Sequence, residues 1–177
     1  MTTTRWATVD TPDGAFTVLA AADGVLASGW TDDVASLVPL VHPSLRPGPD
    51  DGPATDGDAL ERALDAVGAY YDGDLAAPSR VAVRQRSGQF QGHAWDVLRT
   101  VAAGERITYT EYAARAGRPA AVRAAAAACA ANAAALFVPC HRVLRSDGSL
   151  GGFRYGLAVK ARLLEREGFH PAGPTLF

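Results

Sequence analysis

Val138-Pro139-Cys140-His141-Arg142-Val143 places a thiol directly after a proline and directly before two basic side chains. Residues 136–138 are apolar and predicted to be buried, and Pro139 ends regular structure at that point. Neighbouring cations lower the pKa of a thiol toward neutrality. The segment therefore predicts a half-sheltered, reactive Cys140 at the exit from a buried element. An inert core residue is the alternative, because free cysteine is among the most often buried types.

Composition is typical of a soluble globular protein with one large or two small domains, since 48% of the 177 residues are hydrophobic and 20% are charged. No apolar run approaches the roughly 20 residues of a membrane span, and the N-terminus lacks the apolar core of a signal peptide. We therefore expect a cytoplasmic protein whose two cysteines, Cys129 and Cys140, stay unpaired. Cys129 lies in an alanine-rich stretch and is predicted to be a small core residue.

Charge divides the chain into unlike halves. Residues 1–86 hold 6 Arg against 13 acidic residues, a net charge of −7, whereas residues 87–177 hold 11 basic against 6 acidic residues, a net charge of +5. Such asymmetry favours a basic, nucleic-acid-facing domain beside an acidic one, although +5 is also an ordinary solvated surface. We accordingly predict two domains, 1–86 and 87–177.

The first half is predicted to be a small α/β unit. Arg5–Val9, Ala15–Ala22 and Val25–Trp30 are typical of short strands, and Asp-Gly pairs at 13–14 and 23–24 favour hairpin turns between them. Residues 42–58, rich in Pro, Gly and Asp, predict a loop. Asp58 is expected to cap a helix running to about Tyr71. Residues 81–86 alternate apolar and polar side chains, which indicates an edge strand or an extended linker.

The second half is predicted to be mostly helical. Apolar spacing indicates helices over residues 89–102, 111–116, 120–131 and 157–167, the second capped by Thr110. The two middle helices flank a Gly-Arg-Pro turn at 117–119, a pattern typical of a helix-turn-helix, although alanine-rich pairs are often only packing units. Glu167 lies in the last turn of the final helix, where the helix dipole disfavours negative charge. It is therefore either simply exposed or paired with a cationic or imidazole partner.

The ordered motifs of the second half resemble the O6-alkylguanine–DNA alkyltransferase family. They are Gly104-Glu105-Arg106-Ile107-Thr108-Tyr109, Gly117-Arg118-Pro119-Ala120-Ala121-Val122-Arg123, Asn132, Pro139 to Val143, Gly156-Leu157-Ala158-Val159-Lys160, and Glu167-Gly168. The resemblance runs from about Phe90 to Gly168 and is faint before Ser87. It implies an α/β (α+β) fold in which a small, three-stranded, ribonuclease-H-like sheet with a helix precedes a mostly helical domain carrying a winged-helix-like helix-turn-helix.

The resemblance also implies an irreversible, single-turnover reaction. Cys140 would accept a methyl or other alkyl group from O6 of a guanine, or from O4 of a thymine, flipped out of duplex DNA. His141 would take the thiol proton through a water, and Glu167 would orient His141. Tyr109 would donate a proton toward the leaving base. The partner would be double-stranded DNA that holds the alkylated base. The protein would bind it as a monomer in the nucleoid, with cooperativity on DNA left open. The reaction would need no metal or cofactor.

Further residues take family roles by position. Arg123 would fill the gap left by the flipped base, since a planar guanidinium both stacks and donates hydrogen bonds, and Asn132 would brace the turn before the active-site segment. The expected DNA-contacting set is Thr108, Tyr109, Arg123, Ala126 and Ala127, and the expected pocket and supporting set is Asn132, Pro139, Arg142, Val143, Phe153, Arg154 and Tyr155. Each of three residues also has a structural alternative when taken singly. Tyr109 is equally typical of a packed aromatic, Arg123 of a solvated helix charge and Asn132 of a helix C-cap.

Three positions depart from the family pattern. Asn132 is followed by Ala133 where proline is usual, Ala126 stands where glycine is usual, and Phe153 stands where tyrosine is common. Three other classes are weighed against the alkyltransferase reading. Non-reacting lesion sensors lack the active-site cysteine; a Cys–His hydrolase rarely uses adjacent residues; and Cys129, Cys140 and His141 lack the spacing of a zinc module.

Overall fold

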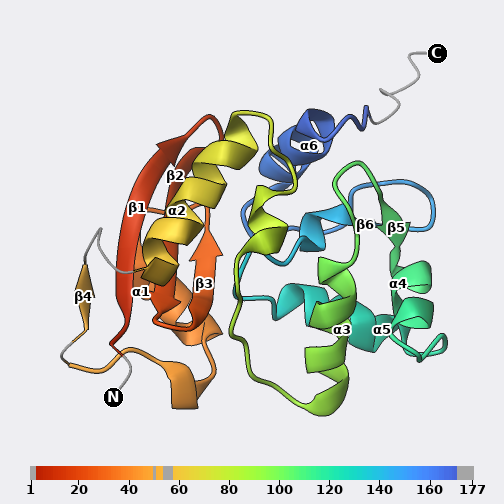
Figure 1. Ribbon diagram of the computed structural model, residues 1–177. Helices are drawn as coiled ribbons and strands as arrows, with labels where there is room; N and C mark the ends of the chain where they lie inside the picture. The colour runs from red at the N-terminus through yellow and green to blue at the C-terminus, as the bar shows by residue number, and fades with distance from the viewer. Residues whose placement is uncertain (1–2, 50, 54–57, 171–177) are drawn as a thin grey trace.

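The computed structural model describes residues 3–49, 51–53 and 58–170 (Figure 1). A sheet of four strands occupies the N-terminal side, in the order β3-β2-β1-β4. β1 (Arg5–Thr11), β2 (Gly14–Ala21) and β3 (Gly24–Gly29) pair antiparallel, and β4 (Gly52–Pro53) adds to β1 in parallel. Positive φ angles at Gly14 and Gly24 let the two Asp-Gly hairpins close as predicted.

The expectation of three strands was wrong by one, because part of the predicted loop over residues 42–58 supplies β4. The same stretch forms a 3₁₀ turn, η2 (Pro43–Leu45), while residues 50 and 54–57 lie outside the described residues. Thr4 donates its backbone N–H to the carboxylate of Asp51 at 2.6 Å, which fastens the segment just before β4 beside the start of β1. The two-residue strand β4 therefore lies within a stretch of loop-like composition, where the alternation of apolar and polar residues is too short to predict a strand.

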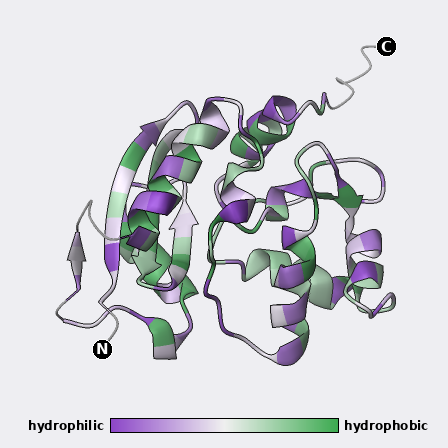
Figure 2. Ribbon diagram, viewed as in Figure 1, coloured by the Kyte–Doolittle hydropathy of each residue, from purple (hydrophilic) through white to green (hydrophobic). Residues whose placement is uncertain are grey.

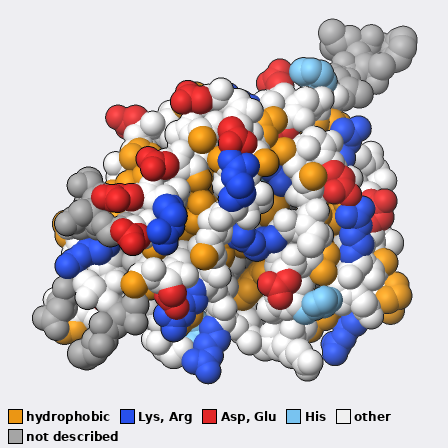
Figure 3. Space-filling model, viewed as in Figure 1, with side chains coloured by type: hydrophobic (Ala, Val, Ile, Leu, Met, Phe, Trp, Pro, Cys, Tyr) orange, Lys and Arg blue, Asp and Glu red, His pale blue; other side chains and the backbone are white. Residues whose placement is uncertain are grey.

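α2 (Asp58–Tyr71) covers one face of the sheet, and α1 (Val34–Leu37) with η1 (Val38–Leu40) follows β3 (Figure 1). Asp58, expected as the cap, is the first described residue of α2, and the residues directly before it lie outside the described part of the chain. Leu60, Val67 and Tyr70 are buried against the sheet, and Figure 2 shows green, hydrophobic residues on the strands behind α2. Acidic side chains gather over α2 (Figure 3). The exposed acidic residues of this helix and the residue just after it are Asp58, Glu61, Asp65 and Asp72.

A connecting segment leads from η3 (Ala77–Arg80) into the second half. Within it, Val83 forms a single parallel bridge with Val25, because Arg84 donates its backbone N–H to the Val25 carbonyl at 2.8 Å and Ala82 accepts from Val25 at 2.9 Å. The segment is therefore an extended linker that touches the edge of the sheet at one point. Its side chains contact both halves, because Arg84 donates to Asp23 of the first half at 3.0 Å and Gln85 donates to Asn132 of the second half at 3.0 Å.

The second half comprises α3 (Gln89–Arg99), α4 (Tyr109–Arg115), α5 (Val122–Ala130) and α6 (Leu157–Arg166), with η4 (Cys140–Arg142) and the short parallel pair β5 (Ile107–Thr108) and β6 (Val143–Leu144). α3 ends three residues earlier than predicted, where the Thr100 hydroxyl bonds the Val97 carbonyl. Within the described part of the chain, no helix is long and apolar enough to cross a membrane.

The cap predicted for the next helix was also wrong. Thr108, not Thr110, caps α4: its hydroxyl accepts from the Glu111 backbone at 3.1 Å while the Glu111 carboxylate accepts from the Thr108 backbone at 2.7 Å. Because a reciprocal capping box satisfies two orphan donors at once, the earlier start is favoured. Tyr109 is consequently the first residue of the helix, which begins two residues earlier than predicted.

One apolar core joins the two halves. Phe16 and Tyr70 from the first half belong to the same buried cluster as Leu98, Phe137 and Leu163 from the second. A smaller cluster around Leu19, Leu26 and Leu37 lies beneath α1. The division at residue 86 remains a prediction about folding units, since the halves share a core at their contact.

Candidate active site

The chain reaches Cys140 through a buried and constrained segment. Residues 132–139 are all buried, and Leu136 adopts a φ of 74°, a left-handed conformation that branched side chains rarely take. Val138 donates its backbone N–H to Ala134 at 2.9 Å, and Cys140 donates to Val138 at 2.8 Å. Strained backbone of this kind persists only where its surroundings fix it. The segment therefore holds Cys140 rigidly.

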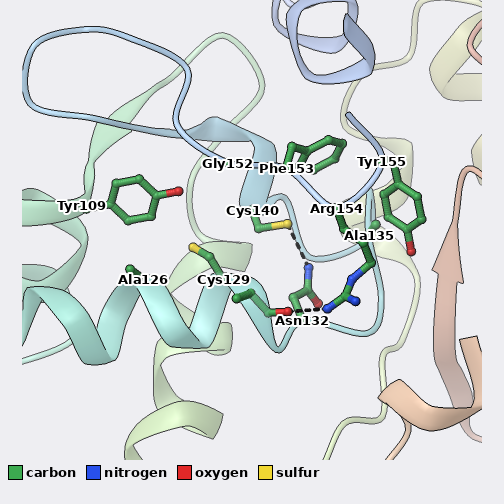
Figure 4. Close-up of a pocket in the computed structure, with 11 residues that line it drawn as sticks. Tyr109, Ala126, Cys129, Asn132, Ala135, Cys140, Gly152, Phe153, Arg154 and Tyr155 are labelled. Carbon is green, nitrogen blue, oxygen red and sulfur yellow. Dashed lines mark hydrogen bonds between the residues drawn. The ribbon is translucent and has the colours of Figure 1, made fainter. Parts of the chain in front are cut away.

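Cys140 opens into a cavity of about 360 Å³ between α5, the η4 turn and the chain before α6 (Figure 4). Seven of the expected residues line it: Tyr109, Ala126, Asn132, Cys140, Phe153, Arg154 and Tyr155. Cys129 lines it too: it is half-buried and packs against the apolar core, in line with the prediction of a core residue, but it also faces the cavity. Both thiols are free. The cavity wall is otherwise made of small groups, Ala130, Ala135 and Gly152, which leaves room for a flat ring beside the thiol.

Asn132 binds the thiol directly. Its Nδ2 donates to the Val138 carbonyl at 2.8 Å and to the Cys140 Sγ at 3.3 Å (Figure 4). Its Oδ1 accepts from the Ala134 backbone at 3.1 Å and from Gln85 Nε2 at 3.0 Å. Every hydrogen-bonding group of this buried amide is therefore used, and one of its donors is spent on sulfur.

Behind the thiol lies a buried polar cluster. His141 Nε2 and Glu167 Oε1 are 2.9 Å apart, and Arg142 donates from Nε and Nη2 to the two oxygens of Glu167, each at 2.9 Å. Tyr70, from α2, donates its hydroxyl to Glu167 Oε1 at 3.0 Å. Burial alone would raise the pKa of Glu167, but His141 and Arg142 outweigh it and hold that pKa well below its usual range. Glu167, which caps the C-terminus of α6, thus has the cationic and imidazole partners that were one of the two alternatives expected for it.

His141 is held as a neutral base. Burial lowers its pKa, against the opposing effect of Glu167. Since the carboxylate accepts the hydrogen on Nε2, the lone pair remains on Nδ1. Nδ1 is buried and makes no hydrogen bond to any described residue. The ring therefore has one proton fixed by Glu167 and one basic nitrogen available.

The direction expected for the thiol pKa was wrong. Burial raises the pKa of Cys140, and the Asn132 hydrogen bond and Lys160 only partly oppose this. The cations next to Cys140 in sequence do not activate it, because His141 is neutral and Arg142 is paired with Glu167. Cys140 consequently rests as a protonated thiol.

Tyr109 faces Cys140 from across the cavity because β5, which precedes Tyr109, pairs with β6, which follows η4. In Figure 4 its hydroxyl points into the cavity. Burial, with a contribution from the two cysteines, raises the pKa of Tyr109 to about 12. Tyr109 is therefore a protonated hydroxyl able to donate to a bound ring.

Residues 152–155, which lie just before α6, form the remaining wall. Lys160 is completely buried, and its Nζ donates to the carbonyls of Val143 at 2.8 Å, Leu150 and Gly152. Burial lowers the pKa of Lys160 to about 8. On the other side, Phe153 and Tyr155 pack against Trp30 of the first half, with ring centroids 6.0 and 5.5 Å away. The wall is thus held from both halves.

Other expected residues lie away from the cavity. Arg123 and Ala127 are exposed on α5, and Thr108 is occupied as the α4 cap. Pro139, Arg142 and Val143 are buried in support of the thiol. No three His, Cys, Asp or Glu side chains among the described residues come together as metal ligands.

The sequence predicts no role for Tyr70 or Gln85, and it includes Lys160 only in a motif shared with the family. No local signal marks the first two, since they lie 97 and 47 residues from their partners. Lys160 did carry a signal: a lysine on the apolar stripe of α6, at a position shared with Leu163 and Leu164, indicates a buried amine that needs carbonyl partners.

Known proteins resemble the chain as follows. Residues 89–169 match the family described as 6-O-methylguanine DNA methyltransferase, DNA binding domain. A methylated-DNA–protein-cysteine methyltransferase of Mycolicibacterium paratuberculosis is 36% identical over 174 residues, 98% of each chain. The Escherichia coli bifunctional transcriptional activator/DNA repair enzyme Ada is 37% identical over 163 residues, 92% of this chain but 45% of Ada, so the chain spans less than half of that relative. The crystal structure of Mycobacterium tuberculosis OGT in complex with DNA superposes with a TM-score of 0.72 at 29% identity, covering 93% of both chains.

Proposed function

The chain belongs to the methylated-DNA–protein-cysteine methyltransferase family, and on that premise we propose that it repairs DNA by moving an alkyl group from O6 of guanine onto Cys140. The observation that carries the proposal is a thiol at the wall of a ring-sized cavity, hydrogen-bonded by Asn132 and backed by a neutral, oriented histidine. The same chemistry extends to O4 of thymine, whose alkyl ether is equivalent.

The reaction is a single displacement. The Cys140 sulfur attacks the alkyl carbon, an S–C bond forms, the C–O6 bond breaks, and its electron pair passes to the guanine ring. His141 Nδ1 takes the thiol proton through a water, and Glu167 stabilises the imidazolium that results. The raised pKa of Cys140 makes this proton transfer necessary rather than incidental. Tyr109 donates toward the ring as its negative charge grows, which suits a hydroxyl whose pKa burial has raised to about 12.

DNA is the partner, and the base must leave the stack to reach the cavity. α4 and α5 act as a helix-turn-helix whose second helix meets the groove, and exposed Arg123 fills the vacated position. Thr108, Ala126 and Ala127 lie along the same contact. Phosphate contacts release counterions, so binding weakens as salt rises. The protein works as a monomer on nucleoid DNA in the cytoplasm, with residues 87–177 as the reacting domain.

Stoichiometry tests the proposal. The protein is incubated with duplex DNA holding one O6-methylguanine, and its cysteines are mapped by mass spectrometry. One methyl group per molecule should appear on Cys140 and none on Cys129, and Cys140→Ala should still bind the duplex. Binding without methyl transfer would instead indicate a non-catalytic lesion sensor, and repeated turnover would indicate a hydrolase.

A further inference from the structure

Gln85 lies in the connecting segment between the halves, yet its side chain reaches the turn that supports Cys140. Its Nε2 donates to Asn132 Oδ1 at 3.0 Å, and its Oε1 accepts from the Ala133 backbone N–H at 2.9 Å. The same carboxamide group therefore donates one hydrogen bond and accepts another. Gln85 thus contacts the residue that binds the sulfur and the residue after it.

The orientation of these amides follows from backbone donors. The Ala133 N–H is a donor only, so the Gln85 oxygen must face it, and the Gln85 NH₂ must then face Asn132. The group of Asn132 turned toward Gln85 is consequently its oxygen, which also accepts from the Ala134 N–H. The Asn132 NH₂ is left facing the Val138 carbonyl and the sulfur. A flipped Asn132 would set an oxygen lone pair against a developing thiolate.

Ala133 explains why the contact is needed. Ala133 is 2% exposed, so its backbone N–H is shielded from water, and an unpaired buried donor is costly. A proline at 133, as is usual in the family, would carry no N–H and need no acceptor. Here the N–H is present and Gln85 satisfies it, while the other end of the same carboxamide binds Asn132.

We propose that Gln85 is a positioning residue for alkyl transfer, which holds Asn132 in the orientation that donates a hydrogen bond to the Cys140 sulfur. The inference rests on the proposed function only where it concerns transfer from alkylated DNA. The effect of Gln85 on the thiol of Cys140 can be measured without DNA. Asn132 Oδ1 keeps the Ala134 donor when Gln85 is removed, so the effect is graded rather than absolute.

The test compares Gln85→Met, which keeps the length but removes both hydrogen bonds, with Gln89→Met at an exposed glutamine four residues along. Two rates are measured: methyl transfer from O6-methylguanine duplex, and carboxamidomethylation of Cys140 by iodoacetamide across pH, with the adduct mapped by mass. Gln85→Met should slow both by about threefold to tenfold at neutral pH, the value of one hydrogen bond, and should shift the thiol pH profile upward. Gln85→Glu should be slower still, because a carboxylate oxygen then faces Asn132 Oδ1.

The double variant Gln85→Met/Ala133→Pro separates two roles of Gln85. One is to orient Asn132, and the other is to accept the hydrogen bond of the buried Ala133 N–H. The proline removes the unpaired N–H, so it should recover part of the melting temperature but leave the thiol profile shifted. An unchanged iodoacetamide profile in Gln85→Met, or full recovery of both rates by Ala133→Pro, overturns the proposal. If the wild-type protein takes no methyl from DNA, the proposed function fails, yet the iodoacetamide comparison still decides the role of Gln85.

Discussion

Glu167 joins three distant parts of the chain through one carboxylate. It is bound by His141 and Arg142 from the active-site turn and by Tyr70 from the first half. Because the pKa of this carboxyl is lower in the fold than in the unfolded chain, its ionised form stabilises the fold at pH values above the unfolded pKa of about 4.3. This stabilisation is lost as the pH falls through the folded pKa. The buried neutral His141 acts in the same direction, because unfolding lets it bind a proton below about pH 6.5. Acid should therefore unfold the protein through this cluster.

Tyr70→Phe tests whether the first half tunes the chemistry. Loss of the hydroxyl removes one donor from Glu167 Oε1, which strengthens its remaining bond to His141 but leaves the carboxylate less fixed in place. We expect methyl transfer to slow by a few-fold and the free energy of unfolding to fall by about 1 kcal/mol. Single-turnover kinetics and denaturant titration measure the two effects.

Tyr71→Phe is the matched control, because its hydroxyl binds Trp30 and Asp13 and makes no contact with Glu167 among the described residues. It should lower stability similarly while leaving the transfer rate intact. Equal rates for the two variants would mean that Tyr70 serves the fold alone.

At the scale of the element, α5 carries an unbroken alanine surface to the cavity and to the expected DNA contact. Glycine within a helix is about 1 kcal/mol less favourable than alanine, but it lets a backbone approach a ligand closely. Ala126→Gly should therefore lower the melting temperature yet tighten duplex binding. Because Ala126 also lines the cavity, the rate toward free O6-methylguanine base is measured alongside to separate a change in the pocket from a change in DNA contact. Calorimetry and a duplex titration test this. Unchanged or weaker affinity would mean that α5 docks differently, and the role of Arg123 would fall with it.

α6 holds the cavity wall through Lys160, and its altered pKa gives a distinct pH signature. The pKa of Lys160 is about 8 in the fold and about 10.4 in an unfolded chain. Between these values the unfolded state binds more protons, so stability from this group rises with pH. The unfolding free energy of the wild type should therefore rise relative to that of Lys160→Met, by up to about 3 kcal/mol between pH 8 and 10.5. A difference that is flat or falling with pH contradicts the assignment.

At the scale of the whole molecule, the first half builds part of the pocket. A Cβ on Gly29 would lie 1.9 Å from the Tyr155 hydroxyl oxygen, and that hydroxyl donates to the Ser28 carbonyl at 3.2 Å. Gly29→Ala should therefore displace Tyr155 from the cavity wall and slow methyl transfer about tenfold or more, since small misplacements at a site are costly.

Gly68→Ala provides the comparison, because an added Cβ there meets no atom within 4 Å. It lies in α2 and should stabilise the helix by up to about 1 kcal/mol without changing the transfer rate. Transfer at the wild-type rate in Gly29→Ala would show that the pocket tolerates movement of Tyr155.

Local chemistry could be predicted well from the sequence alone. The Asp-Gly hairpins, the helical periods and the buried run before Pro139 each depend on residues within a few positions of one another, whereas the partners of Glu167 lie 25 to 97 residues away. Boundaries were less exact: the Thr108 capping box and the two-residue β4 depend on contacts that periodicity does not register.

Only the tertiary structure decided what surrounds the thiol. It set the direction of the Cys140 pKa, because burial outweighs neighbouring charges that in the fold face elsewhere, and it brought Cys129 to the cavity. Tyr70, Gln85 and Gly29 act on the site from the first half and the connecting segment, where nothing in their local sequence indicates it. A pattern in sequence records backbone preference over a few residues, whereas desolvation and hydrogen bonding depend on which distant groups the packed core brings together.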